Sequence, residues 1–156
     1  ACDSAGSSAG QDMSDRSYWK EALTADRSVV GEYTQSRITD TAVLPIARAV
    51  RDGDGVVQAV LATGIRLDWL GERLRERGVT PSGALTVADR NGVILARHPA
   101  PERFVGTRIP DGFQHLVRAA RPGTLDLVSQ DGEARIVGYQ PVGLPVPGIY
   151  VSAGLA

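Results

Sequence analysis

The protein has 156 residues, of which 42% are hydrophobic and 22% are charged, a composition typical of a folded globular domain. The formal net charge of -1 argues against a nucleic-acid-binding protein, for which an excess of basic residues is expected. The single cysteine excludes an internal disulfide and a zinc site built from several cysteines. No apolar run approaches the roughly 18 residues that a membrane span needs.

The first part of the chain predicts a loop, a short helix and a strand. Ala1–Ser14 is small and polar and is expected to be a loop. Asp15 or Ser17 can cap a helix over Arg16–Leu23 by accepting hydrogen bonds from its first backbone amides. Ser28–Tyr33 is rich in β-branched residues, which predicts a strand.

A hairpin and a second helix are expected next. Ala42–Val50 and Val56–Ile65 predict two antiparallel strands, because the Asp-Gly pairs of Arg51–Gly55 favour a hairpin turn. Leucines recur at helical spacing over Leu67–Arg77, which predicts an amphipathic helix ending at Gly78.

The second half predicts two strands, an irregular stretch over Pro99–Pro110, a short helix over Phe113–Ala120, and three more strands. The expected strands are Gly83–Val87, Val93–Arg97, Thr124–Ser129, Ala134–Pro141 and Gly148–Ala153. Two antiparallel strands, a helix and three further strands is the order of a PAS-like sensor module. The sequence therefore predicts an α+β fold.

Residue types that often carry catalysis or bind metals occur here without their usual partners. His98 and His115 are the only histidines, and no nucleophile elbow or metal motif accompanies them. Asp52–Gly55 is similar to the start of a calcium loop, but the later ligands are missing, so a hairpin turn is favoured. We expect no catalytic residue, no metal site and no cofactor.

The candidate binding residues are aromatic residues near two arginines: Arg16, Tyr18, Trp19, Tyr33 and Arg66. A guanidinium group beside aromatic rings can hold a carboxylate through two charge-assisted hydrogen bonds while the rings exclude water. Alternatively, the two aromatic residues of the helix belong to the core, and Arg16 is an exposed residue at the helix start. The arginine that follows the apolar strand either faces the same cavity or ends the strand at the surface.

Taken in order, several segments resemble the double Cache family of extracytoplasmic sensor domains of bacterial transmembrane receptors. The segments that carry the resemblance are Asp15–Leu23, Val29–Tyr33, Val43–Ala47, Val50–Gly55, Leu67–Leu70, Ala88–Pro99 and Val105-Gly106. The resemblance covers about residues 10–156, and its specificity comes from the order of the segments.

The resemblance implies two PAS-like modules, each an antiparallel sheet with flanking helices. Residues 1–78 would be the membrane-distal, ligand-binding module without its long N-terminal helix, and residues 79–156 the membrane-proximal module. It further implies flanking transmembrane helices beyond this chain, a periplasmic location in an inner-membrane protein, and a possible homodimer. No ligand site is expected in the second module.

The resemblance also suggests roles for the candidate residues. In amino-acid-binding members an Arg and two aromatic residues at the helix start hold the ligand carboxylate, and Arg16, Tyr18 and Trp19 match them by position. Tyr33 matches a pocket tyrosine. Arg66 stands where those members have an Asp that holds the ligand ammonium, so a small anionic metabolite such as an organic acid is expected instead.

Three classes of function are compatible with the sequence to different degrees. The first is a ligand sensor whose output is a histidine kinase, with a diguanylate cyclase or a chemoreceptor as alternatives. The second is a structural or dimerisation module without ligand, in which Trp19 fills the pocket. The third is an enzyme, but the domain itself is not expected to be one, because no catalytic motif is present.

Overall fold

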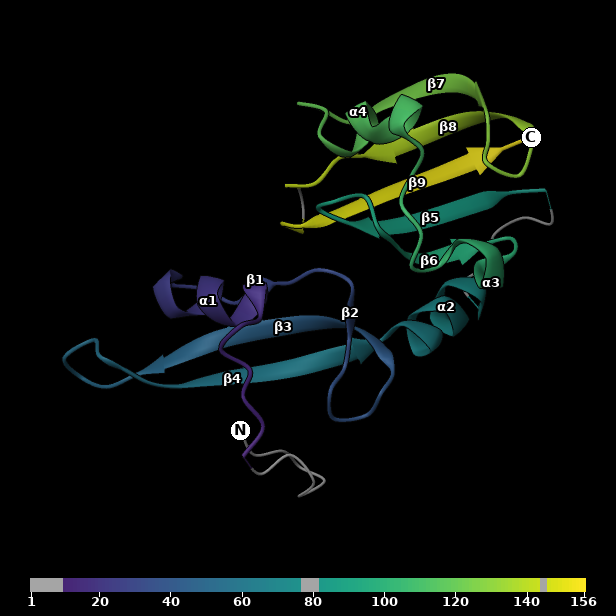
Figure 1. Cartoon of the computed structure of the whole chain (residues 1–156). Coiled ribbons are helices and arrows are strands. Elements are labelled where there is room, and N and C mark those ends of the chain that lie inside the picture. The colour runs from purple at the N-terminus through teal and green to yellow at the C-terminus, as the bar shows by residue number, and fades with distance from the viewer. Residues whose placement is uncertain (1–9, 77–81, 144–145) are drawn as a thin grey trace. The chain divides into compact units, whose positions relative to one another are not determined.

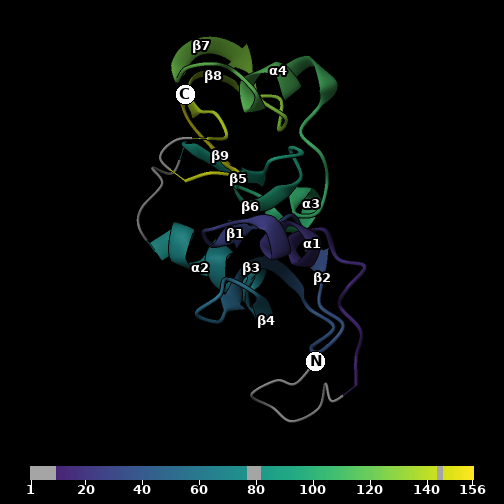
Figure 2. The same cartoon turned by 90° about the vertical axis from the view of Figure 1, so that its left-hand side faces the viewer.

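The computed structural model describes residues 10–76, 82–143 and 146–156. The chain divides into two compact units, Ala1–Arg66 and Leu67–Ala156. Both contain antiparallel sheets and short helices, so the predicted α+β class is confirmed (Figures 1 and 2).

The first unit is a small antiparallel sheet with one helix. Its elements are α1 (Ser17–Thr24), β1 (Val29–Val30), β2 (Thr34–Gln35), β3 (Ala42–Arg51) and β4 (Val57–Arg66). The long strand β3 pairs with β4 along one side and with β1 and β2 along the other. The predicted hairpin is thus confirmed, with Gly55 at a φ of 81° in its turn.

The helix α1 covers one face of this sheet. Tyr18 and Ala22, which lie four residues apart and therefore on the same side of the helix, are buried against Val29 and Ala47. Val29 is the direct partner of Ala47 in the β1–β3 register. Directly opposed residues of an antiparallel pair point to the same side of the sheet, so the register defines which residues share the face with α1.

Of the strand expected over Ser28–Tyr33, only Val29–Val30 forms a strand, β1, and the next strand, β2, begins after this range at Thr34. Val30 pairs with Ile46, whereas Thr34 pairs with Val43, so this segment has one residue more than a continuous register would hold, as in a β-bulge. The interruption falls opposite Pro45, which has no backbone N–H to donate. Its carbonyl still accepts a 2.8 Å hydrogen bond from the Gly31 amide.

The second unit is built on a five-stranded antiparallel sheet. Its elements are α2 (Leu67–Glu76), β5 (Ala84–Asp89), β6 (Ile94–His98), α3 (Pro101–Phe104), the 3-10 helix η1 (Asp111–Phe113), α4 (Gln114–Val117), β7 (Gly123–Val128), β8 (Ala134–Gln140) and β9 (Ile149–Leu155). The strand order is β6-β5-β9-β8-β7. The five strands expected from the sequence are therefore present, and α4 lies beside the sheet (Figure 1).

The hydrophobic core of the second unit lies between this sheet and the segment that contains η1 and α4. Ile94, Leu116, Val117 and Tyr150 are buried there. Outside this core, α2 contacts β6. The helix α2 therefore falls within the second compact unit, and the module boundary expected after residue 78 stays a prediction.

Two local expectations in this unit are wrong. The stretch over Pro99–Pro110 contains the short helix α3, in which Pro101 takes the first helical position, where its missing N–H costs nothing. The helix expected over Phe113–Ala120 already ends at Val117. The carbonyl of Val117 accepts a hydrogen bond from the Val142 amide instead of one from a further helical turn. The expected helix end at Gly78 falls outside the described residues.

Among the residues that the structure describes, none of the helices has the length and apolar character needed to cross a membrane.

Gly31 is expected to be indispensable for the packing of β1 on β3. A Cβ at this position would lie 2.7 Å from Pro45 Cγ and 3.0 Å from Tyr18 Cβ. We predict that Gly31→Ala destabilises the protein by about 1–3 kcal/mol, the usual cost of overpacking a core. Urea unfolding of the variant and the parent measures this difference.

The matched control is Gly53→Ala in the hairpin turn of the same unit, where a Cβ meets nothing within 4 Å. This variant is expected to stay within about 0.5 kcal/mol of the parent. Equal unfolding midpoints for the two variants would show that the close approach at Gly31 does not limit stability.

Candidate ligand-binding site

The start of α1 is fixed by an ion pair that the sequence did not predict. Arg37 donates hydrogen bonds of 2.8 and 2.7 Å to the two carboxylate oxygens of Asp15 and one of 2.9 Å to the Asp12 carbonyl. The expectation that Asp15 or Ser17 caps the helix is wrong: the N-cap residue is Arg16, without a side-chain cap. Both oxygens of Asp15 are already occupied by the guanidinium fork.

Arg16 links the start of α1 to the sheet. Its Nη2 donates a 3.2 Å hydrogen bond to the backbone carbonyl of Gln35 in β2. Its Nε is buried and has no hydrogen-bond partner within the described part of the chain. Leaving a buried donor of a charged group without a hydrogen bond costs folding free energy. The Nε of Arg16 can therefore still donate a hydrogen bond to an acceptor.

The two aromatic residues of α1 serve the core more than the surface. Tyr18 is 8% exposed and lies in the cluster with Ala22, Val29 and Ala47. Trp19 is partly buried against the same cluster. Tyr18 is thus part of the core of the first unit, whereas Trp19 keeps part of its surface accessible, and a ligand-binding role for either residue stays a prediction.

The two remaining candidates lie in the sheet region of the first unit. Tyr33 is half-buried in the segment between β1 and β2, and Arg66 is the exposed last residue of β4. Thr34 and Arg66 are both direct partners of Val43. These three residues therefore form a cross-strand row on the face that α1 covers, since Val43 and Ala47 lie an even number of residues apart.

This row brings the two arginines to the same end of the unit. Arg16 is bonded to Gln35, the neighbour of Thr34, and Arg66 lies two strands further along the row. Adjacent strands are about 4.8 Å apart, so roughly 10 Å separates the backbones of β2 and β4.

The side of this region formed by β4 is open. Most residues of β4 are exposed, among them Leu61 with 71% of its surface accessible. Among the described residues β4 pairs only with β3. Arg66 is therefore reachable from solvent in this chain.

The comparisons with known proteins identify the fold. No family model matches the chain and no curated protein matches it, but 69 solved chains do. The extracellular domain of rpHK1S-Z16, a protein named as a histidine kinase, is 20% identical with a TM-score of 0.75, over 94% of this chain and 61% of that one. The ligand-binding domain of the Pseudomonas fluorescens chemoreceptor CtaA, determined with L-serine, is 22% identical with a TM-score of 0.69, over 94% and 62%.

The chain has the fold of bacterial extracellular sensor domains. A methyl-accepting chemotaxis protein is similar as well, with 21% identity and a TM-score of 0.75 over 93% of this chain and 56% of that one. The chain thus spans about three fifths of the length of these structures. The sensor-domain fold implied by the resemblance to Cache domains is confirmed, while the double Cache subtype and the residue roles stay predictions.

The second unit contains a cavity, although no ligand site was expected there. The signal that could have indicated it is Arg97, a charged residue at the end of the apolar run Val93–Ala96. A charged side chain in a buried strand needs polar or charged partners, and such partners gather at one end of the cavity.

The ion pair between Arg37 and Asp15 is expected to make the stability of the first unit depend on pH in the acid range. The hydrogen bonds from Arg37 hold the pKa of Asp15 below its ordinary value of 3.8. The stabilisation from this pair is present above the unfolded-state pKa and is lost as the pH falls through the lower, folded-state pKa. We predict that Arg37→Gln brings the pKa of Asp15 back towards 3.8, as measured by an NMR pH titration of the carboxyl group.

Arg27→Gln, which removes an exposed arginine just after the same helix, serves as the control and is expected to leave that pKa in place. An unchanged Asp15 titration in Arg37→Gln would mean that the ion pair does not form in solution.

Proposed function

We propose that the chain is the ligand-sensing part of an extracytoplasmic domain in a bacterial membrane signalling protein, and that its first unit binds a small anionic metabolite such as an organic acid. The fold supports the sensor role, because structures with this fold include extracellular and ligand-binding domains of a histidine kinase and of chemoreceptors. The output proposed is a histidine kinase, with a diguanylate cyclase or a chemoreceptor as alternatives.

The observation that supports an anionic ligand is the placement of Arg16 and Arg66. Both lie at the same end of the first unit, and Nε of Arg16 is buried without a hydrogen-bond partner among the described residues. Guanidinium groups bind carboxylates through paired, charge-assisted hydrogen bonds. Two of them on one ligand favour a second negative group and disfavour an ammonium group.

An amino acid is the competing ligand class. Similar structures were determined with L-serine and L-alanine in the chemoreceptor CtaA and with asparagine in Mlp24. An amino acid needs an acceptor for its ammonium group as well as a donor for its carboxylate. In this chain the position proposed to hold the ammonium carries Arg66, which supports an organic acid instead.

Signal transmission follows the usual logic of a two-state sensor. A ligand that binds one conformation of the first unit more tightly shifts the population towards it by at most its difference in affinity for the two states. In the proposed arrangement, residues 1–78 bind the ligand, residues 79–156 lie nearer the inner membrane, and flanking transmembrane helices carry the change to the output domain. The domain itself needs no catalytic group for this role, and a homodimer would be compatible with it.

A ligand-free structural or dimerisation module is the second candidate. The packing of Tyr18 and Trp19 against the core of the first unit favours it, because side chains that fill a pocket leave less room for a ligand. Thermal unfolding separates the two candidates. A ligand specific for the first unit raises the midpoint in a concentration-dependent way that Arg66→Asp weakens, whereas a filled pocket gives no shift that depends on Arg66.

A thermal-shift screen of dicarboxylates, monocarboxylates and amino acids tests the proposed ligand class. We expect organic acids to raise the midpoint, and we expect Arg66→Asp to weaken their binding by about 10- to 150-fold, the loss of one hydrogen bond to a charged group. Calorimetric titration of the best organic acid gives the affinities of both proteins.

Arg48→Asp is the matched control, because Arg48 is exposed in β3 and pairs with Leu61, on the face opposite to Val43 and Arg66. This variant is expected to bind like the parent. Unchanged binding in Arg66→Asp would place Arg66 outside the site, and tighter binding of neutral or cationic compounds than of organic acids would refute the anionic ligand.

A further inference from the structure

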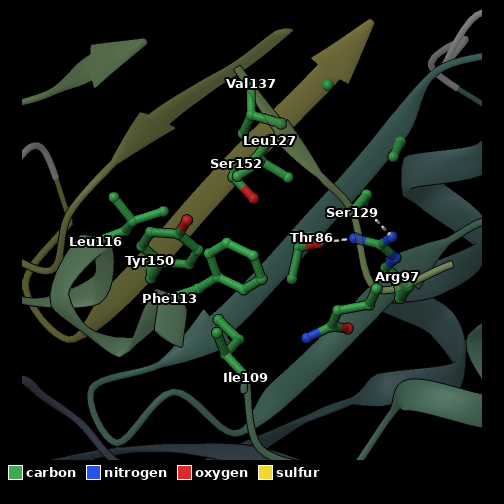
Figure 3. Close-up of a pocket in the computed structure, with 13 residues that line it drawn as sticks. Thr86, Arg97, Ile109, Phe113, Leu116, Leu127, Ser129, Val137, Tyr150 and Ser152 are labelled. Carbon is green, nitrogen blue, oxygen red and sulfur yellow. Dashed lines mark hydrogen bonds between the residues drawn. The ribbon is translucent and has the colours of Figure 1, made fainter. Parts of the chain in front are cut away.

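The second unit contains a cavity that lies between its sheet and the segment with η1 and α4 (Figure 3). Residues from all five strands, from the β7–β8 turn and from the helical segment surround it. The space in which the centre of a water-sized group can lie is about 50 Å³. One water molecule needs roughly 10–15 Å³ of such space.

The cavity has an apolar end and a polar end. Phe113, Leu116 and Tyr150 lie together on one side, whereas Arg97, Thr86 and Ser129 lie on the other (Figure 3). The polar end is fixed by the sheet register: Thr86 is the direct partner of both Arg97 in β6 and Ser152 in β9. These three side chains therefore form a cross-strand row on the face that lines the cavity.

The polar end presents hydrogen-bond donors. The guanidinium group of Arg97 donates to the hydroxyl oxygens of Thr86 and Ser129, the latter at 3.1 Å. A hydroxyl group that accepts such a bond still has its own hydrogen to donate, so both hydroxyls can donate to a further acceptor. Nε of Arg97, a donor, is buried without a hydrogen-bond partner among the described residues, as are two acceptors nearby, Oε1 of Gln130 and Oδ2 of Asp131.

Near the polar end, two buried arginines share one carboxylate. The side chains of Arg97 and Arg135 are each 5% exposed, and both face the single carboxylate of Asp131, at 3.7 Å in the case of Arg97. None of the lining residues of the cavity is acidic. Burial lowers the pKa of Arg97, but an arginine keeps its proton at neutral pH. A buried cation with incomplete compensation is costly, and a bound monoanion would complete the neutralisation.

We propose that this cavity is a second ligand site, which binds a short-chain monocarboxylate of about three to five non-hydrogen atoms. The carboxylate lies against the hydroxyls of Thr86 and Ser129 that Arg97 orients, and the alkyl group packs against Phe113, Leu116 and Tyr150. The proposal concerns a different unit from the proposed organic-acid site and does not depend on it.

The shape and chemistry of the cavity also predict what it rejects. An amino acid of the same length brings an ammonium group, which the guanidinium group of Arg97 repels; Oε1 of Gln130 could accept from it, but no carboxylate lies among the lining residues. A longer fatty acid exceeds the volume. Three probes therefore test these properties separately. Alanine adds an ammonium group to propionate, and hexanoate lengthens its alkyl chain.

Titration of the whole chain with propionate, followed by amide NMR spectra, tests the proposal. We expect saturable shifts around Thr86, Ser129 and Ser152 with a Kd of about 0.1–10 mM, which is within reach for so few ligand atoms. Alanine and hexanoate are expected to bind at least about tenfold more weakly, a difference of about 1.4 kcal/mol. Shifts that do not saturate, or alanine binding as well as propionate, would overturn the proposal and leave a water-filled cavity.

Variants then assign the site to its residues. Thr86→Val and Ser129→Ala each remove one donor and are expected to weaken propionate binding by about tenfold or more; the second keeps the proposal testable if the first misfolds. Thr124→Val changes an exposed threonine of the same sheet and is expected to bind like the parent. Unchanged affinity in Ser129→Ala together with Thr86→Val would refute the assignment. Arg66→Asp in the first unit is expected to leave propionate binding intact, and loss of binding there would place the propionate site in the first unit.

Discussion

The antiparallel register of the two sheets determines where the candidate ligand-binding side chains on the strands lie. In the first unit the pairing of Val43 with both Thr34 and Arg66 places Arg66 on the face that α1 covers. In the second unit the pairing of Thr86 with both Arg97 and Ser152 places three polar side chains in one row beside the cavity. Because side chains alternate along a strand, a slip of one residue would turn either row to the opposite face. Both candidate sites therefore depend on strand pairing as well as on the helical residues that complete them.

Two arginines, the half-buried Arg16 and the buried Arg97, are held mainly by neutral groups. Arg16 donates to a backbone carbonyl, and Arg97 donates to two hydroxyls. A carboxylate in direct contact with either guanidinium group would neutralise it and leave little to attract an anion, whereas a neutral acceptor orients the group and leaves most of its field in place. Arg97 also lies 3.7 Å from a carboxylate oxygen of Asp131, but this carboxylate is hydrogen-bonded to Arg135, so it compensates Arg97 only in part. Each unit thus has an arginine that donates to neutral acceptors, although the first half of the sequence is acidic overall.

Local patterns in the sequence predicted those features that neighbouring residues decide. The Asp-Gly turn between β3 and β4, the amphipathic α2 and the succession of strands in the second unit follow from spacing and turn chemistry within short windows. The break at Gly31–Tyr33 could not be predicted in this way, because it depends on Pro45 in a strand that follows later in the chain. The cavity depends on residues from Ala84 to Gly154, whose proximity only the completed sheet creates. Arg97 is its one local signal, as a charge at the end of an apolar run.

The position of the cavity shows which strands of the second unit a bound ligand would contact. β5 is the first strand of this sheet in chain order and β9 is the last, and the two are neighbours in the sheet. A carboxylate held by Thr86 with an alkyl group on Tyr150 would touch both strands at once. A ligand stabilises the conformation that it binds. Such a contact would therefore favour conformations in which β5 and β9 keep their native pairing. The strand that opens the sheet and the strand that completes it are therefore the two elements that a ligand in this cavity would hold together.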